Sequence, residues 1–322
     1  MSVAAPSGEI SAPRPRLPAV DLARGVAIVA MVVYHTAFDL YAEGLIASDA
    51  ENGLVWKLFA RTVATSFLVL VGIGLVLASR GGIVWPRYWR RVALVAVGAI
   101  LVSVATWFFD SETFVYFGIL HQIAVASVLA LPFLVAPWWV VAAAAAVIIA
   151  APWFATSPAF GAPWLLWLGL GPDVRSTLDY VPLLPWFGAV LAGILAGRVV
   201  VRYSAVMAKW RLAWPPASWL CLAGRWSLVI YLVHQPLIFG AVHLYATAFP
   251  PSVETTRARF VGQCERAVCE AGDKSCAAYC GCVFDGLYGT DLYPPRRPSD
   301  LTEDQASRQQ AVLNACRAAS PQ

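Results

Sequence analysis

Long apolar runs alternate with short polar loops along most of the chain, and this pattern predicts helices that cross a membrane. Crossing the hydrocarbon core of a bilayer takes about 20 largely apolar residues in a helix. Segments near this length are 19–41, 55–79, 91–109, 113–134, 138–154, 181–201 and 221–249. We therefore expect an all-α fold, a polytopic transmembrane bundle of about seven helices.

Both ends of the chain depart from this pattern. Residues 1–18 are rich in Pro, Ser and Ala, which predicts a disordered N-terminus, and no cleavage site follows the first apolar run. Residues 251–322 have ordinary polarity and predict a small helical tail, with helices near 254–279 and 302–318. Thr302 and Gln305 form a capping-box pattern at the start of the second. The predicted domains are thus 1–18, 19–250 and 251–322.

Composition supports the membrane prediction. Hydrophobic residues make up 59% of the chain and charged residues 13%, against roughly 25% charged in an average soluble domain. The net charge is only +4, so it gives no reason to expect a nucleic-acid partner. The expected partner is the lipid bilayer.

Lys and Arg in the short loops predict the orientation, because cytoplasmic loops carry an excess of them. With the N-terminus in the cytoplasm, that side holds Arg14, Arg16, Arg24, Arg80, Arg87, Arg90, Arg91, Arg198, Arg202, Lys209, Arg211 and Arg225. The other side holds Lys57, Arg61 and Arg175. An odd number of crossings then puts the C-terminal tail outside the cytoplasm.

The tail also concentrates cysteine. It contains Cys264, Cys269, Cys276, Cys280, Cys282 and Cys316, all but one of the seven in the chain. An even set in a short extracytoplasmic segment favours disulfides, which small domains use as staples. Zinc ligands and free thiols are the alternatives, and the sequence does not decide the pairing. We expect disulfides and no metal.

Ionisable residues inside apolar helices are costly, so each suggests a partner or a water-lined cavity. In the first helix Asp21, Arg24, His35 and Asp39 share one face, because their spacings follow the helical repeat. His121 lies in the fourth segment, Asp179 just before the sixth, and His234 with Gln235 in the seventh, all at similar depths. A cavity open to the outer side is expected. The alternatives are histidines that only fix helix packing, and an Asp21–Arg24 ion pair that is only structural.

Three motifs carry a family resemblance. The first helix contains Asp21-Leu22-Ala23-Arg24-Gly25, followed by Met31 and Tyr34-His35. The other two are Phe117-Gly118-Ile119-Leu120-His121 and Pro182-Leu183-Leu184-Pro185-Trp186-Phe187-Gly188. Together, over about residues 16–240, they resemble bacterial members of the heparan-alpha-glucosaminide N-acetyltransferase family. The resemblance implies a membrane-embedded acyltransferase that moves an acetyl group from cytoplasmic acetyl-CoA to an extracytoplasmic sugar amine or hydroxyl.

The resemblance suggests roles for the polar residues. Arg24, Arg87, Arg90 and Arg91, with Asp21, would hold the CoA phosphates, because guanidinium groups pair well with phosphate. His35 would be the general base, since imidazole changes charge near neutral pH. His121 and Asp179 would orient the reacting groups. The acceptor-binding residues would be Asp39, His234, Gln235 and Trp186.

Other functions remain open from the sequence. The same polar groups suit a transporter of a small polar or sugar substrate, and a noncatalytic scaffold that presents the tail is a third hypothesis. The expected location is a bacterial inner (plasma) membrane, with the glycan acceptor outside. The sequence leaves open whether the chain forms a homo-oligomer.

Overall fold

A computed structural model describes residues 17–50, 53–172, 177–204, 215–269, 275–295 and 300–319. The apolar helices are α1 (Pro18–Ala42), α2 (Leu54–Ser79), α3 (Trp85–Phe109), α4 (Ile119–Leu129), α5 (Leu131–Val135), α6 (Trp138–Phe154), α7 (Leu183–Arg202), α9 (Pro215–Arg225) and α10 (Ser227–Ala248). Two 3-10 helices, Pro158–Gly161 and Leu166–Leu168, lie between α6 and α7. The tail forms α11 (Val253–Val268), α12 (Ser275–Leu287) and α13 (Glu303–Ala319).

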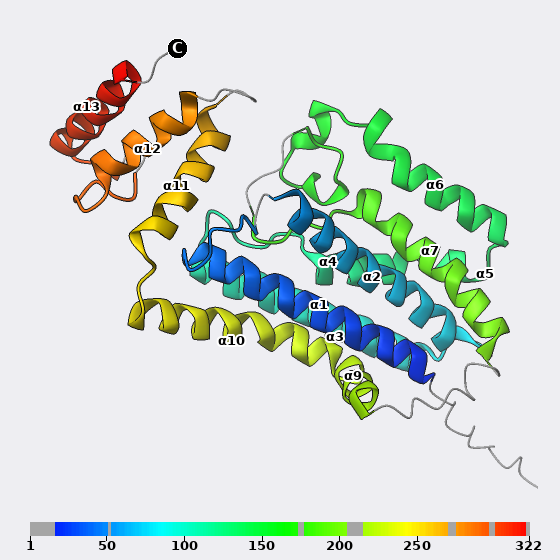
Figure 1. The fold of residues 1–322 in the computed structure, drawn as a ribbon. Coiled ribbons are helices and arrows are strands. Elements are labelled where there is room, and N and C mark those ends of the chain that lie inside the picture. Colours follow the sequence, from blue (N-terminus) through cyan, green and yellow to red (C-terminus); the bar gives the residue numbers. More distant parts are fainter. Residues whose placement is uncertain are drawn as a thin grey trace, which may run out of the picture. The chain divides into compact units, whose positions relative to one another are not determined.

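The all-helical prediction is confirmed (Figure 1). By length and composition, α1, α2, α3, α7 and α10 can each cross a membrane. The predicted fourth and fifth spans correspond to the shorter apolar helices α4–α5 and α6. The chain is therefore an integral membrane protein. The predicted N-terminal disorder lies largely outside the described residues, as do Arg14, Arg16, Arg175, Lys209 and Arg211.

Several boundaries differ from the prediction. The third helix begins at Trp85, about two turns early, and the fourth begins only at Ile119. The loop before α4 is held instead by residues 177–181: Leu178 donates to the Thr113 carbonyl (2.9 Å) and Val181 to the Phe117 carbonyl (3.1 Å). Three predicted continuous helices are split in the structure: one between α4 and α5, one between α9 and α10, and one between α11 and α12.

Small residues bring α2 and α7 into close contact. A Cβ atom on Gly72 would collide with the Val190 carbonyl oxygen, and one on Gly193 with the Val69 carbonyl oxygen. The main apolar core continues from this contact to α4 and α6, with Leu68, Val141, Val190, Leu191 and Ile194 fully buried. Glycines thus allow the close backbone approach that is common in membrane bundles.

Arg198 of α7 binds the carbonyl groups at the end of α5. α5 ends at Val135 beside α7, and its last carbonyls lack helical partners. The Arg198 Nη2 atom of α7 donates to the carbonyls of Phe133 (2.8 Å) and Ala136 (2.7 Å). This residue therefore stabilises the α5 terminus.

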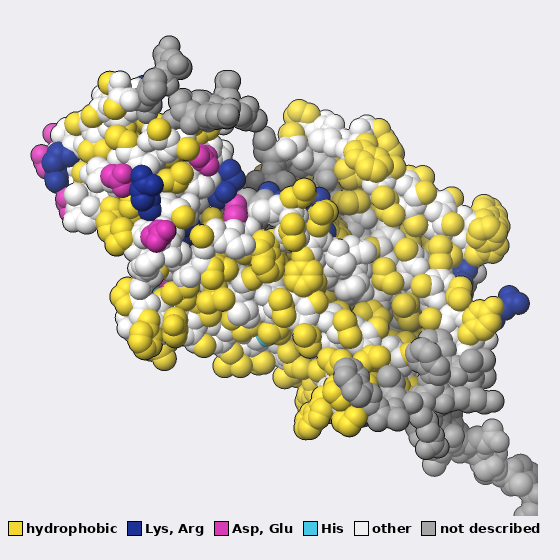
Figure 2. All heavy atoms as spheres, in the orientation of Figure 1, with side chains coloured by type: hydrophobic (Ala, Val, Ile, Leu, Met, Phe, Trp, Pro, Cys, Tyr) yellow, Lys and Arg dark blue, Asp and Glu magenta, His cyan; other side chains and the backbone are white. Residues whose placement is uncertain are grey.

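The chain divides into two compact units. The first comprises Met1–Val32 and Phe59–His234, and the second Val33–Leu58 and Gln235–Gln322. In Figure 2, hydrophobic side chains cover the visible surface over the long apolar helices, and most of the visible charged side chains lie over α11–α13. Such apolar cover suits contact with lipid.

Three disulfides staple the tail. They join Cys264 to Cys280, Cys269 to Cys276 and Cys282 to Cys316. Sulfur atoms of Cys269, Cys276 and Cys280 lie within 4.8 Å of one another, but each belongs to a disulfide, whereas zinc binds thiolates. The predicted capping box is present, since Thr302 and Gln305 exchange backbone-to-side-chain hydrogen bonds of 3.2 and 3.3 Å.

Candidate active site

The first unit contains a cavity of about 1060 Å³. Its walls come from the first two turns of α1, the second half of α2, the start of α3, the start of α4, and the α9–α10 junction. Polar groups are concentrated at one end. That end is lined by Arg24, Arg80, Arg87, Arg90, Arg91 and Arg225, and Asp21 is the one acidic residue in the lining.

The arginines greatly outnumber their acidic partner. Asp21 pairs with both Arg24 (Oδ1 to Nη1, 3.6 Å) and Arg225 (Oδ2 to Nε, 3.4 Å). Within the described part of the chain no carboxylate pairs with Arg91. Like charges near one another in a partly enclosed space repel strongly. The cavity mouth is therefore strongly cationic.

Gly74 makes room for two of these guanidinium groups. A Cβ atom at Gly74 would lie 2.9 Å from the Arg24 Nη2 atom and 3.4 Å from the Arg91 Nη2 atom. Arg24 and Arg91, from α1 and α3, thus reach the same point on α2.

The other end of the cavity is mostly apolar. Phe67 of α2, Ile119 and Leu120 of α4, and Tyr231 of α10 line it. Phe67 precedes Arg80 by 13 residues, which corresponds to about 20 Å along a helix. An elongated ligand with an anionic head and an apolar arm fits this division of the lining.

His121 and Asp179 meet at the N-terminus of α4. The Ile119 N–H donates to Asp179 Oδ2 (2.8 Å), and the Gly118 N–H donates to His121 Nδ1 (3.3 Å). A Cβ at Gly118 would collide with the Asp179 carboxylate, so glycine is required there. Burial raises the pKa of Asp179, in the loop before α7, to about 6, while its hydrogen bond from Ile119 opposes the shift.

Both ring nitrogens of His121 are engaged. Because Nδ1 accepts from Gly118, the neutral ring carries its proton on Nε2, which faces Ser103 Oγ at 3.2 Å. Ser103 in turn donates to the Val115 carbonyl (2.6 Å). This chain of hydrogen bonds holds the His121 ring in place at the start of α4.

Two other predicted residues lie in the first unit. His234 of α10 is buried, and its Nδ1 lies 2.6 Å from the Tyr231 carbonyl oxygen. Trp186 of α7 is partly buried and packs against the main core. Neither is among the residues that line the arginine-rich cavity.

His35, Asp39 and Gln235 belong to the second unit. His35 is half-buried, and its ring lies edge-on to Tyr34 at 5.3 Å between centroids. Asp39 is 1% exposed and accepts a hydrogen bond from Gln235 Nε2 (2.8 Å). Asp39 Oδ2 and Gln235 Oε1 are buried, without hydrogen-bond partners in the described residues. Both atoms are acceptors, so this pair suits a ligand that donates hydrogen bonds.

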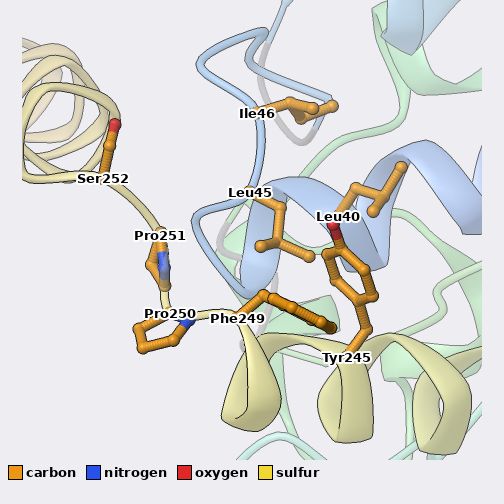
Figure 3. Close-up of a pocket in the computed structure, with 8 residues that line it drawn as sticks. All are labelled: Leu40, Leu45, Ile46, Tyr245, Phe249, Pro250, Pro251 and Ser252. Carbon is orange, nitrogen blue, oxygen red and sulfur yellow. The ribbon is translucent and has the colours of Figure 1, made fainter.

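The second unit also has an open apolar pocket of about 580 Å³. It lies between the end of α1, the end of α10 and the linker to α11, where Leu45, Tyr245 and Phe249 face one another (Figure 3). The tail docks nearby through Arg266, which pairs with Asp49 (2.6 Å) and donates to Tyr41 Oη (3.2 Å).

The five predicted cofactor residues line one cavity, although they come from α1 and α3. Arg80, Arg225 and Tyr231 line it too and were not among the predicted site residues. The loop charges of Arg80 and Arg225 were the available signal. For Tyr231 the sequence offered no such signal.

The fold and this cavity define a polytopic membrane protein with an arginine-lined cavity inside its helix bundle. The family model described as heparan-alpha-glucosaminide N-acetyltransferase, catalytic, matches residues 16–236. The chain belongs to this family of membrane acetyltransferases. Searches of curated proteins and of solved structures gave no match.

Proposed function

We propose that the protein transfers an acetyl group from cytoplasmic acetyl-CoA to an amine or hydroxyl of an extracytoplasmic sugar. The arginine-rich cavity is the observation that carries this proposal. CoA has several phosphate groups at one end and an apolar arm that ends in the thioester. Guanidinium groups pair with phosphate through directed hydrogen bonds, and the apolar part of the lining suits the arm.

Arg24, Arg87, Arg90 and Arg91 would hold the phosphates, with Asp21 orienting Arg24 and Arg225. The thioester would then lie at the apolar end, near the α4 N-terminus that His121 and Asp179 fix. This arrangement orients the acyl donor and shields the thioester from water.

The acceptor would bind through Asp39 and Gln235, each of which has one buried oxygen without a donor in the described residues. His234 and Trp186 are further candidates for contact with the acceptor. His35 would remove a proton as the acceptor attacks the thioester carbonyl. A C–N or C–O bond forms, the C–S bond breaks, and the proton ends on the CoA sulfur.

Loop arginines and tail disulfides support the orientation. With the mouth of the cavity in the cytoplasm, the disulfide-stapled tail lies outside it, where disulfides persist. The proposed location is a bacterial inner membrane.

Proteoliposomes loaded with radiolabelled acetyl-CoA test this function. We expect labelled acetyl-sugar outside the vesicles, and loss of this product in His35→Ala. His243→Ala is the matched control: His243 of α10 is exposed and bound to Glu43 (3.0 Å), so it should keep activity. Uptake of unmodified sugar without acetylation would instead support a transporter. Full activity in His35→Ala would remove His35 from the chemistry.

A further inference from the structure

Tyr231 places a hydroxyl at the apolar end of the arginine-rich cavity. Among the lining residues at that end it has the one polar side chain; the others named there are Phe67, Ile119 and Leu120. Its ring packs against two of the apolar clusters of the first unit, one of which includes Ile28 and Met31. The ring position is therefore fixed by packing.

The Tyr231 hydroxyl is available to a ligand. Within the described residues, no group forms a hydrogen bond with the hydroxyl, although the Tyr231 backbone carbonyl lies 2.6 Å from His234 Nδ1. The residue is half-buried and lines the cavity. A phenol keeps its proton at neutral pH, so this group can donate one hydrogen bond into the cavity.

Asp179 is a charged group near Tyr231. Asp179 lies close enough to act on the phenol electrostatically, and the same carboxylate accepts from the Ile119 N–H (2.8 Å). The start of α4 and Tyr231 thus line the same cavity, and Asp179 holds the start of α4. A reacting group there would meet a single fixed donor within an apolar wall.

We propose that Tyr231 is a catalytic residue that donates a hydrogen bond to the thioester carbonyl oxygen. This inference rests on the proposed function, because it takes the cavity as the acetyl-CoA site. When the acceptor attacks, the carbonyl oxygen gains negative charge in the tetrahedral intermediate. A fixed donor stabilises that charge more than it stabilises the neutral carbonyl. Collapse of the intermediate breaks the C–S bond and restores the carbonyl.

Tyr231→Phe removes the donor and keeps the ring. In full-length protein reconstituted in vesicles, we expect kcat to fall roughly 100-fold to 1000-fold, as for other oxyanion donors. The KM for acetyl-CoA should stay the same, because the arginines bind the phosphates. Tyr88→Phe is the matched control. The Tyr88 hydroxyl donates to the Ser127 carbonyl, outside the cavity lining, so this variant loses a structural hydrogen bond only.

Infrared spectra of bound acetyl-CoA, labelled with ¹³C at the carbonyl, provide a readout without turnover. A hydrogen bond lowers the carbonyl stretching frequency, so the band should lie lower in the wild type and in Tyr88→Phe than in Tyr231→Phe. A wild-type band at the frequency found in an apolar solvent would overturn the role of Tyr231, whether or not the variant folds. An unchanged kcat in Tyr231→Phe would also overturn the role of Tyr231. The proposed function would still stand in that case, because the wild type would still acetylate the sugar. A wild type that binds no acetyl-CoA would overturn both.

Discussion

Gly72 on α2 and Gly193 on α7 lie against each other's helix backbone. A Cβ atom on Gly72 would lie 2.7 Å from the Gly193 carbonyl carbon, and one on Gly193 would be 2.9 Å from the Val69 Cα atom. Both distances are far below ordinary contact, so even one methyl group would force the helices apart.

Gly193→Ala should therefore destabilise the bundle. Overpacking of this kind costs about 1–3 kcal/mol, and we expect the apparent melting temperature in detergent to fall by several degrees. Gly240→Ala is the matched control, because nothing lies within 4 Å of a Cβ at Gly240 on α10. Equal melting temperatures for the two variants would contradict the close contact.

If the arginines at the cavity mouth bind the CoA phosphates, the affinity for CoA should depend on these side chains and on salt. Arg24→Gln and Arg91→Gln should each weaken binding roughly 10-fold or more, since hydrogen bonds to charged groups contribute about 1.5–3 kcal/mol. Added salt should weaken wild-type binding as well. Calorimetry on detergent-solubilised protein measures both effects. Arg202→Gln, at the end of α7 and outside the lining, should bind normally; equal losses in all three variants would refute a local site.

A substitution of Asp39 tests which of the two substrates binds at Asp39 and Gln235. Asp39→Asn keeps the shape of the side chain but replaces a buried acceptor oxygen with a donor beside Gln235. If this pair holds the acceptor, its KM should rise while the KM for acetyl-CoA stays constant. Steady-state kinetics with each substrate varied in turn distinguish the two. Glu43→Gln, which alters a carboxylate near the end of the same helix, serves as the control.

The tail disulfides should differ in their effect on stability. Cys282–Cys316 spans 34 residues and Cys269–Cys276 only 7. A longer closed loop restricts the unfolded chain more, by about 1 kcal/mol for this difference. Replacing the first pair by serines should increase protease cleavage within 253–319 more than replacing the second. Digestion of the full-length protein followed by mass spectrometry gives the comparison, and the reverse order would contradict it.

Acid should loosen the tail through Asp291. Hydrogen bonds from Arg308 and Gln305 lower the pKa of Asp291 to about 2, below the ordinary value of about 3.9. A lowered folded-state pKa adds stability above about pH 4, and this stability is lost as pH falls toward 2. Hydrogen exchange at the start of α13 should accelerate over that window, and Asp291→Asn should flatten the dependence. An unchanged profile in the variant would assign the effect to other carboxylates.

Apolar length was enough to locate the membrane helices from the sequence. Each predicted apolar segment overlaps an observed helix or helix pair, because hydrophobic runs reflect the bilayer directly. The start of α4 was different. Residues 113–118 are apolar enough to continue a helix, but their backbone bonds with residues 177–181. Such pairing depends on a segment some 60 residues away, which local pattern does not reveal.

Only part of the candidate site could be predicted from the sequence. Charge in the loops indicated Arg24, Arg87, Arg90 and Arg91, and all line one cavity. The sequence did not distinguish a reactive His121 from one whose two nitrogens are bound. It also gave no sign that Tyr231 faces the same space, since aromatic residues are common in membrane helices.

The brevity of α6 has a consequence for the surrounding lipid. Its 17 residues extend about 25 Å, less than the roughly 30 Å hydrocarbon core of a typical bilayer. Exposed Trp138 and Trp153 stand near its two ends, where indoles favour the headgroup level. Local thinning of the lipid is one way for a bilayer to accommodate so short a span. On this side of the protein the two aqueous phases would approach each other, which shortens the path between a donor in one and an acceptor in the other.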